Sequence, residues 1–112
     1  MGYYSEVRIC TSRAGFERFK ELVPDEGKAL FETGQLKGYG NSVIFGWEFV
    51  KWYEWLPDVT AIMRAMDLLC SEGYPLEFIR IGENYDDNDE RHYNDTSELS
   101  RHIYITRRIS TY

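Results

Sequence analysis

Two cysteines and two histidines are the side chains of this 112-residue sequence that could provide a nucleophile or a zinc site: Cys10, Cys70, His92 and His102. Zinc sites combine such residues at short fixed spacings, and neither cysteine has a second one two or three positions away. Cys70 falls on the apolar side of a predicted helix, where packing explains it without any reactivity. We therefore expect no catalytic residue, no bound metal and no cofactor, and we predict that the protein is not an enzyme.

Carboxylates are the other reactive groups, and they are concentrated at residues 83–98. This stretch holds seven acids and one arginine, whereas the other 96 residues hold twelve acids and twelve bases. The whole net charge of −6 thus comes from one stretch. Nucleic-acid phosphates bind to basic faces, so we expect no direct contact with DNA or RNA. We predict a solvated acidic loop at about 83–98.

A calcium loop is one chemistry that these carboxylates could provide. Counted from Asp87, oxygen ligands could come from Asp87, Asp89 and, at the twelfth position, Glu98. His92 stands where an EF-hand loop needs glycine, and no predicted helices flank the stretch, so the pattern argues against an EF-hand. A metal-dependent binder or small enzyme that uses the acidic loop together with His92 remains the alternative function.

Binding to a protein partner is the function that the sequence favours. Carboxylates can stand where phosphates would lie in a basic groove, and they steer association over long range. The predicted partner-binding residues in the acidic loop are Asp86, Asp87, Asp89 and Glu90. The partner would be a protein with a basic surface, such as a host defence factor or a nucleic-acid-handling factor. A purely solubilising loop would have the same composition.

Aromatic residues form a second unusual run. Six of the eleven residues from Phe45 to Trp55 are aromatic, and all three tryptophans lie there. A strand buried on both faces accounts for Phe45, Trp47 and Phe49. The next aromatic residues, Trp52, Tyr53 and Trp55, cannot all point inward. They either pack locally or anchor a protein interface, and we include them among the predicted partner-binding residues. Self-association through this run is a further alternative.

Seven structural elements should position these groups. Hydrophobic spacing and helix-capping residues predict, in chain order, a strand at 3–11, a helix from Thr11 or Ser12 to Pro24, a shorter helix from Asp25 to Gly34, a strand at 42–53, a helix from Pro57 to Gly73, and strands at 77–82 and 102–109. Residues 34–41 are predicted as loop.

The order β-α-α-β-α-β-β predicts an α+β fold, with helices packed on a mostly antiparallel sheet of about four strands. With 43% hydrophobic residues, the chain can bury a core as one domain, 1–112. Strands 77–82 and 102–109 flank the acidic loop, so we expect them to pair as a hairpin. Shortening 84–98 to a tight turn should then leave the fold stable.

Three short motifs resemble a group of small bacteriophage and prophage proteins. They are MGYYSEV at 1–7, Trp52-Tyr53 ahead of PDV at 57–59, and IRIGE at 79–83 followed by the acidic tract. The resemblance implies a phage-type accessory protein of the host cytoplasm and assigns no catalytic residues. The sequence also lacks an apolar run of about 20 residues and a signal-peptide pattern, which favours the cytoplasm.

Overall fold

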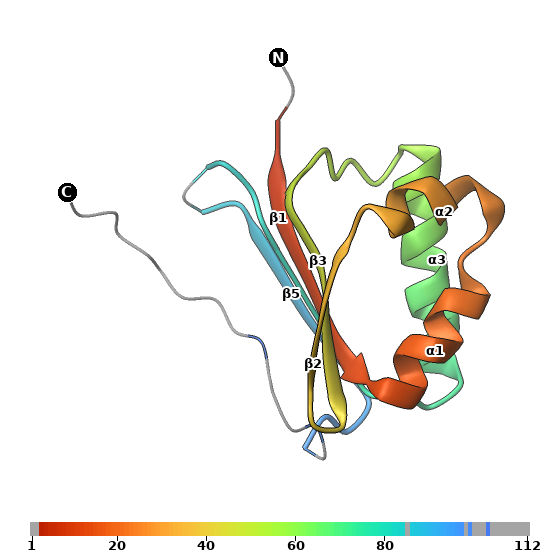
Figure 1. Cartoon of the computed structure of the whole chain (residues 1–112). Helices are drawn as coiled ribbons and strands as arrows, with labels where there is room; N and C mark the ends of the chain where they lie inside the picture. Colours follow the sequence, from red (N-terminus) through yellow and green to blue (C-terminus); the bar gives the residue numbers. More distant parts are fainter. Residues whose placement is uncertain (1–2, 85, 98, 100–102, 104–112) are drawn as a thin grey trace.

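A five-stranded antiparallel sheet with three helices on one of its faces makes up the part of the chain that the structure describes, residues 3–84, 86–97, 99 and 103 (Figure 1). The structure is a computed structural model. In chain order the elements are β1 (Ser5–Ser12), α1 (Arg13–Leu22), α2 (Asp25–Glu32), β2 (Gln35–Tyr39), β3 (Ser42–Val50), α3 (Pro57–Ser71), β4 (Leu76–Ile81) and β5 (Asn88–Tyr93). The predicted α+β class is confirmed.

The strands lie in the order β2-β3-β1-β4-β5, so the first strand of the chain is the central one. Each neighbouring pair is antiparallel, and Ile9 of β1 lies between Phe45 of β3 and Phe78 of β4. The sheet has one strand more than the predicted four. Two of the five strands were not predicted: β2 lies in the stretch that was predicted as loop, and β5 lies in the acidic stretch.

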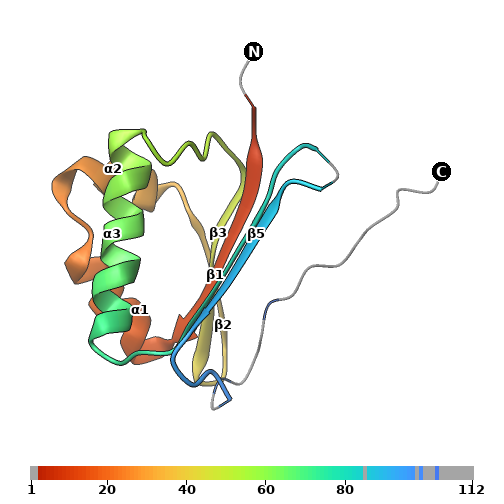
Figure 2. The same cartoon turned by 180° about the vertical axis from the view of Figure 1, so that it is seen from behind.

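Alternation along the strands places one apolar face against the helices. Val7 and Ile9 of β1 point to this side and are fully buried. Phe19 of α1 and Ile62 of α3 meet them in the same core cluster. Both views show the three helices on the same side of the sheet (Figures 1 and 2). Burying such a side chain stabilises the fold by roughly 1.5–3 kcal/mol, so this layer holds the sheet in place. We call the opposite face of the sheet the outer face.

Local sequence signals set the helix ends. The Ser12 hydroxyl caps α1 by accepting the Gly15 N–H at 3.0 Å, which resolves the choice between Thr11 and Ser12. Pro57 occupies the first turn of α3, where its missing N–H costs nothing. Gly73 follows α3 at a φ of +95°, a conformation that glycine adopts without strain. Among the described residues, no helix is both long and apolar enough to cross a membrane.

Two predictions about the acidic stretch are wrong. It is not one long loop, because β5 occupies Asn88–Tyr93 and only a short turn separates it from β4. The two neighbours of β4 are β1 and β5, so β4 does not pair with 102–109. The predicted strand at 102–109 itself lies outside the described residues, apart from Ile103. Polar or charged residues at five of its six positions masked β5 in the sequence, yet an edge strand accommodates them because much of it stays hydrated.

Candidate interaction surface

The three predicted aromatic anchors have three different environments. Trp52 is only 5% exposed, and its ring packs 5.4 Å from that of Trp47 and 6.1 Å from that of Phe78, centre to centre. Its indole N–H has no hydrogen-bond partner among the described residues. Tyr53 is half-buried, whereas Trp55 is 76% exposed. Trp52 is therefore a core residue, and only the other two can meet a partner.

Tyr53 and Trp55 stack on each other in the connection from β3 to α3. Their ring centres are 5.6 Å apart and their planes lie 13° from parallel. The Tyr53 hydroxyl accepts the backbone N–H of Tyr3 at 2.8 Å, which fastens this connection to the start of β1. The stack holds the exposed indole of Trp55 in a fixed position at this end of the sheet.

Phe49 is an exposed residue that was predicted to be buried. Val7 pairs with Trp47 and Ser5 with Val50, so one residue of β1, Glu6, stands opposite two of β3, Glu48 and Phe49. A β-bulge of this kind redirects side chains. Val50 stays in the core, and Phe49 is 80% exposed instead of buried as predicted. A local pattern cannot reveal the bulge, because it is a property of the pairing between two distant strands.

Tyr4 packs against Phe49 and forms a second aromatic pair. Its ring lies edge-on to that of Phe49, 6.3 Å between centres, and the Lys51 ammonium stands 5.7 Å above it. We call Tyr4, Phe49, Tyr53 and Trp55 the aromatic rim. Figure 1 shows that the start of β1, the β4–β5 turn and the β3–α3 connection lie at the same end of the sheet.

The predicted acidic residues separate into paired and exposed groups. The Asp87 carboxylate lies 2.6 Å from Arg80 Nη2, and its other oxygen accepts the Tyr3 hydroxyl at 2.5 Å. The Arg80 guanidinium, and after it the Tyr3 hydroxyl, lower the pKa of Asp87 to about 2. Asp89 pairs with Arg91 at 2.8 Å. Asp87 thus fastens the turn to β4, Asp89 pairs within β5, and both acids are engaged within the chain.

The remaining two predicted acids are exposed in different places. Asp86 stands on the β4–β5 turn, and Glu90 lies in the middle of β5, 3.2 Å from His92 Nε2. Glu83, which precedes Asp86 on the turn, accepts the backbone N–H of Tyr4 and so joins the turn to the aromatic rim. Of the acidic stretch, Glu83 and Asp86 are thus the exposed carboxylates at the same end of the sheet as the rim. Glu83 was not among the predicted partner-binding residues, although it belongs to the acidic stretch.

Among the described residues, the cysteine, histidine and carboxylate side chains considered for chemistry form no metal cluster. Burial, reinforced by the charge of Glu77, raises the pKa of the Cys10 thiol to about 12, and burial raises that of Cys70 to about 11. Neither thiol is therefore primed as a thiolate. Within the described part of the chain, no group of three or more His, Cys, Asp and Glu side chains could hold a metal ion. His102 lies outside that part.

A buried carboxylate on the outer face was not predicted. Glu77 of β4 is 2% exposed, and its Oε1 accepts the backbone N–H of Ile103 at 3.0 Å, while Oε2 lies 3.8 Å from His92 Nδ1. The chain thus returns to the outer face at Ile103. Leu99 is also buried.

Comparison with protein-family models, with curated proteins and with solved structures finds no match to this chain.

Proposed function

We propose that the protein is a non-enzymatic, phage-type accessory protein that binds a host protein through the aromatic rim, in the cytoplasm of a bacterial host. The observation that carries the proposal is the exposure of Phe49 and Trp55, at 80% and 76%, at one end of a sheet whose other phenylalanine and tryptophan side chains, Phe45, Trp47 and Phe78, are buried in the core. Large exposed aromatic residues are the commonest anchors of protein interfaces, because one side chain buries much area at little entropic cost.

The rim is rigid enough to act as an interface. Tyr53 stacks on Trp55, and Tyr4 lies edge-on to Phe49, so each exposed ring is held by a neighbouring one. Each buried aromatic side chain contributes roughly 150–250 Å² of area. Phe49 and Trp55, the two members that are mostly exposed, would supply a substantial part of the roughly 800 Å² that each partner buries in a standard interface. Little side-chain freedom is left to be lost on binding.

Charge next to the rim favours a basic partner. Glu83 and Asp86 stand on the turn beside Tyr4, whereas the neighbouring Asp87 is already neutralised by Arg80. Exposed carboxylates at the edge of an interface mainly accelerate association, and salt screens them. The partner should therefore present apolar pockets bordered by lysine or arginine. A host defence factor or a nucleic-acid-handling factor has such surfaces.

Alanine substitution in the rim tests the proposal. The tagged protein and its Phe49→Ala/Trp55→Ala variant are used to capture partners from host lysate, and any captured protein is purified and titrated directly. Leu68→Ala is the matched control, because Leu68 is also an exposed apolar residue, 50% exposed, but lies on α3. We expect the double variant to weaken binding by at least a hundredfold, since anchor residues cost more than about 2 kcal/mol each. Equal capture by all three proteins would refute the role of the rim.

A second pair of variants tests the charge. Glu83→Gln/Asp86→Asn removes both carboxylates while keeping an acceptor for the Tyr4 N–H, and Glu17→Gln/Glu21→Gln removes two exposed acids from α1. The first pair should slow association and flatten its dependence on salt, and the second should change neither. An unchanged salt dependence with the first pair would show that the partner's charge is not recognised here.

A further inference from the structure

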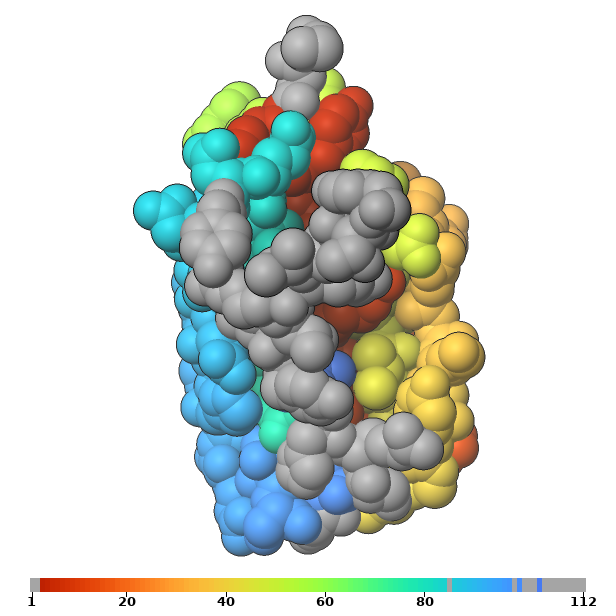
Figure 3. Space-filling view, turned by 90° about the vertical axis from the view of Figure 1, so that its left-hand side faces the viewer, coloured from red at the N-terminus to blue at the C-terminus, as the bar shows by residue number. Residues whose placement is uncertain are grey.

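The edge strand β2 presents a second surface, which the aromatic rim does not use. Among the described residues, β2 pairs with β3 alone, so its other side has no strand neighbour. Four of its five residues are exposed. Figure 3 looks onto the outer face and shows β2 along one side of the molecule and β5 along the other. An edge strand of this kind offers backbone N–H and C=O groups to an added strand.

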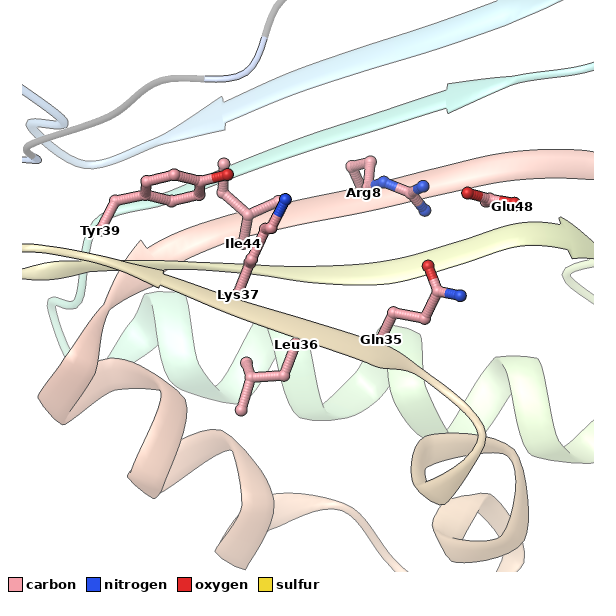
Figure 4. A pocket seen from close by; sticks show the side chains of 7 residues that line it. All are labelled: Arg8, Gln35, Leu36, Lys37, Tyr39, Ile44 and Glu48. Atoms are coloured by element: carbon pink, nitrogen blue, oxygen red, sulfur yellow. The ribbon is translucent and has the colours of Figure 1, made fainter.

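A hollow on the outer face borders this edge. It has a volume of about 380 Å³ and is lined by side chains of β2, β3 and β1. Gln35, Gly46 and Arg8 follow one another across three strands. Figure 4 shows Lys37 and Gln35 rising from β2 on the side of the hollow, with Leu36 directed to the opposite face of the sheet.

The charge of β2 comes from Lys37. Arg8, the other cation of the hollow, lies 3.5 Å from Glu6, whereas Lys37 forms no ion pair with a described residue. Figure 4 shows the Lys37 amine close to Ile44, and Glu48 at the far end of the hollow beyond Arg8. A peptide strand bound along β2 would therefore lie next to the positive charge of Lys37. Leu36, 55% exposed, offers it an apolar contact on the other face.

We propose that β2 binds an extended acidic segment of a second protein, which adds to the sheet as a further antiparallel strand. Alternate side chains of that segment would be carboxylates facing Lys37 over the hollow, and the side chains between them would be apolar and face Leu36. Opposite charges on neighbouring strands attract, whereas like charges repel. For that reason a second copy of the chain is a poor occupant: an antiparallel β2–β2 pair centred on Lys37 places two lysines opposite each other.

Two short peptides test the proposal on the full-length protein. One is acetylated and amidated TVEVEVT, with its glutamates on one face of the strand and valines on the other. The second, TVKVKVT, differs in charge alone. Backbone amide shifts are followed by ¹⁵N NMR as each peptide is added up to millimolar concentration. We expect TVEVEVT to shift Gln35–Tyr39 and their partners in β3, and TVKVKVT to shift nothing.

The variants Lys37→Glu and Lys28→Glu distinguish an effect on binding at the hollow from an effect of the net charge. Both variants change the net charge equally, but Lys28 lies on α2, outside the hollow. We expect Lys37→Glu to weaken TVEVEVT binding by about fivefold or more and Lys28→Glu to leave it unchanged. A TVEVEVT peptide with N-methylated backbone amides should not bind, because the added strand needs its N–H donors.

Three results would overturn the proposal: no shift in β2 at millimolar peptide, equal binding of TVKVKVT, or equal weakening by both lysine variants. Self-association in sedimentation experiments that Lys37→Glu abolishes would instead assign the edge to a second copy. The rim variant Phe49→Ala/Trp55→Ala should bind TVEVEVT normally, so the outcome here is independent of the outcome for the aromatic rim.

Discussion

Replacing Asp87 with asparagine should destabilise the protein, whereas the same replacement at its neighbour Asp86 should not. Asp87 accepts hydrogen bonds from the Arg80 guanidinium at 2.6 Å and from the Tyr3 hydroxyl at 2.5 Å. Asp86 is exposed and forms no hydrogen bond or ion pair with a described residue. The two variants remove the same charge from adjacent positions, so their difference isolates the contacts of Asp87.

The size of the effect follows from these contacts. A hydrogen bond to a charged group contributes roughly 1.5–3 kcal/mol to the free energy of unfolding. The Asp87 side chain is 33% exposed, so water screens its pairing with Arg80, whose side chain is 17% exposed. Asparagine also keeps one acceptor. We expect a loss of about 1–2 kcal/mol for Asp87→Asn and of less than about 0.5 kcal/mol for Asp86→Asn.

The pH dependence gives an independent check. In the folded chain Arg80 lowers the pKa of Asp87 from 3.8 to about 2, so folding favours the ionised form. The stabilisation is complete above a pH of about 4 and is lost as the pH falls through about 2. Urea unfolding followed by tryptophan fluorescence should show a constant gap between wild type and Asp87→Asn from neutral pH to about pH 4, and a closing gap below it. Equal stability of the two variants at neutral pH, or a gap that persists at pH 2, would refute the reasoning.

Three further outcomes are expected. Gly46→Ala should cost about 1–3 kcal/mol in urea unfolding, because the new Cβ would lie 1.9 Å from the Val7 carbonyl oxygen, a backbone atom; full stability would show that β1 and β3 can separate there. Phe45→Ala should cost about 3–5 kcal/mol, whereas Phe49→Ala should change stability by less than about 0.5 kcal/mol, and equal losses would contradict the bulge. Shortening 84–98 to a tight turn should lower the melting temperature sharply because it removes β5, and an unchanged melting curve would show that β5 is dispensable.

Elements with strong local periodicity could be predicted from the sequence. The spacing of Val59, Ile62, Met66 and Leu69 predicted the helix now seen at Pro57–Ser71, with Gly73 just beyond it. The α+β class followed from the order of such elements. Local patterns suffice here because a helix forms its hydrogen bonds within its own segment.

Features that depend on pairing between distant segments could not be predicted. The exposure of Phe49 results from an extra residue opposite β1, and the neutralisation of Asp87 results from Arg80 on the preceding strand. The segment β5 has the composition of a loop. It forms a strand because its backbone pairs with the edge of β4. Tertiary contacts likewise decide which of the predicted partner-binding residues are accessible. Trp52 is in the core and Asp89 pairs with Arg91. The role of Trp55 in binding stays a prediction.

The central position of β1 has a consequence for the synthesis of the chain. Its two neighbours, β3 and β4, are Ser42–Val50 and Leu76–Ile81, and Thr11 ends up beside Leu76. Ribosomes add roughly 5–20 residues per second, so β1 waits on the order of several seconds after its own synthesis for its last neighbour. During that time the apolar side chains of Val7 and Ile9 have no completed sheet to join. The central strand is thus made first and completed last, which makes the nascent chain most exposed to aggregation and to chaperones before β4 emerges.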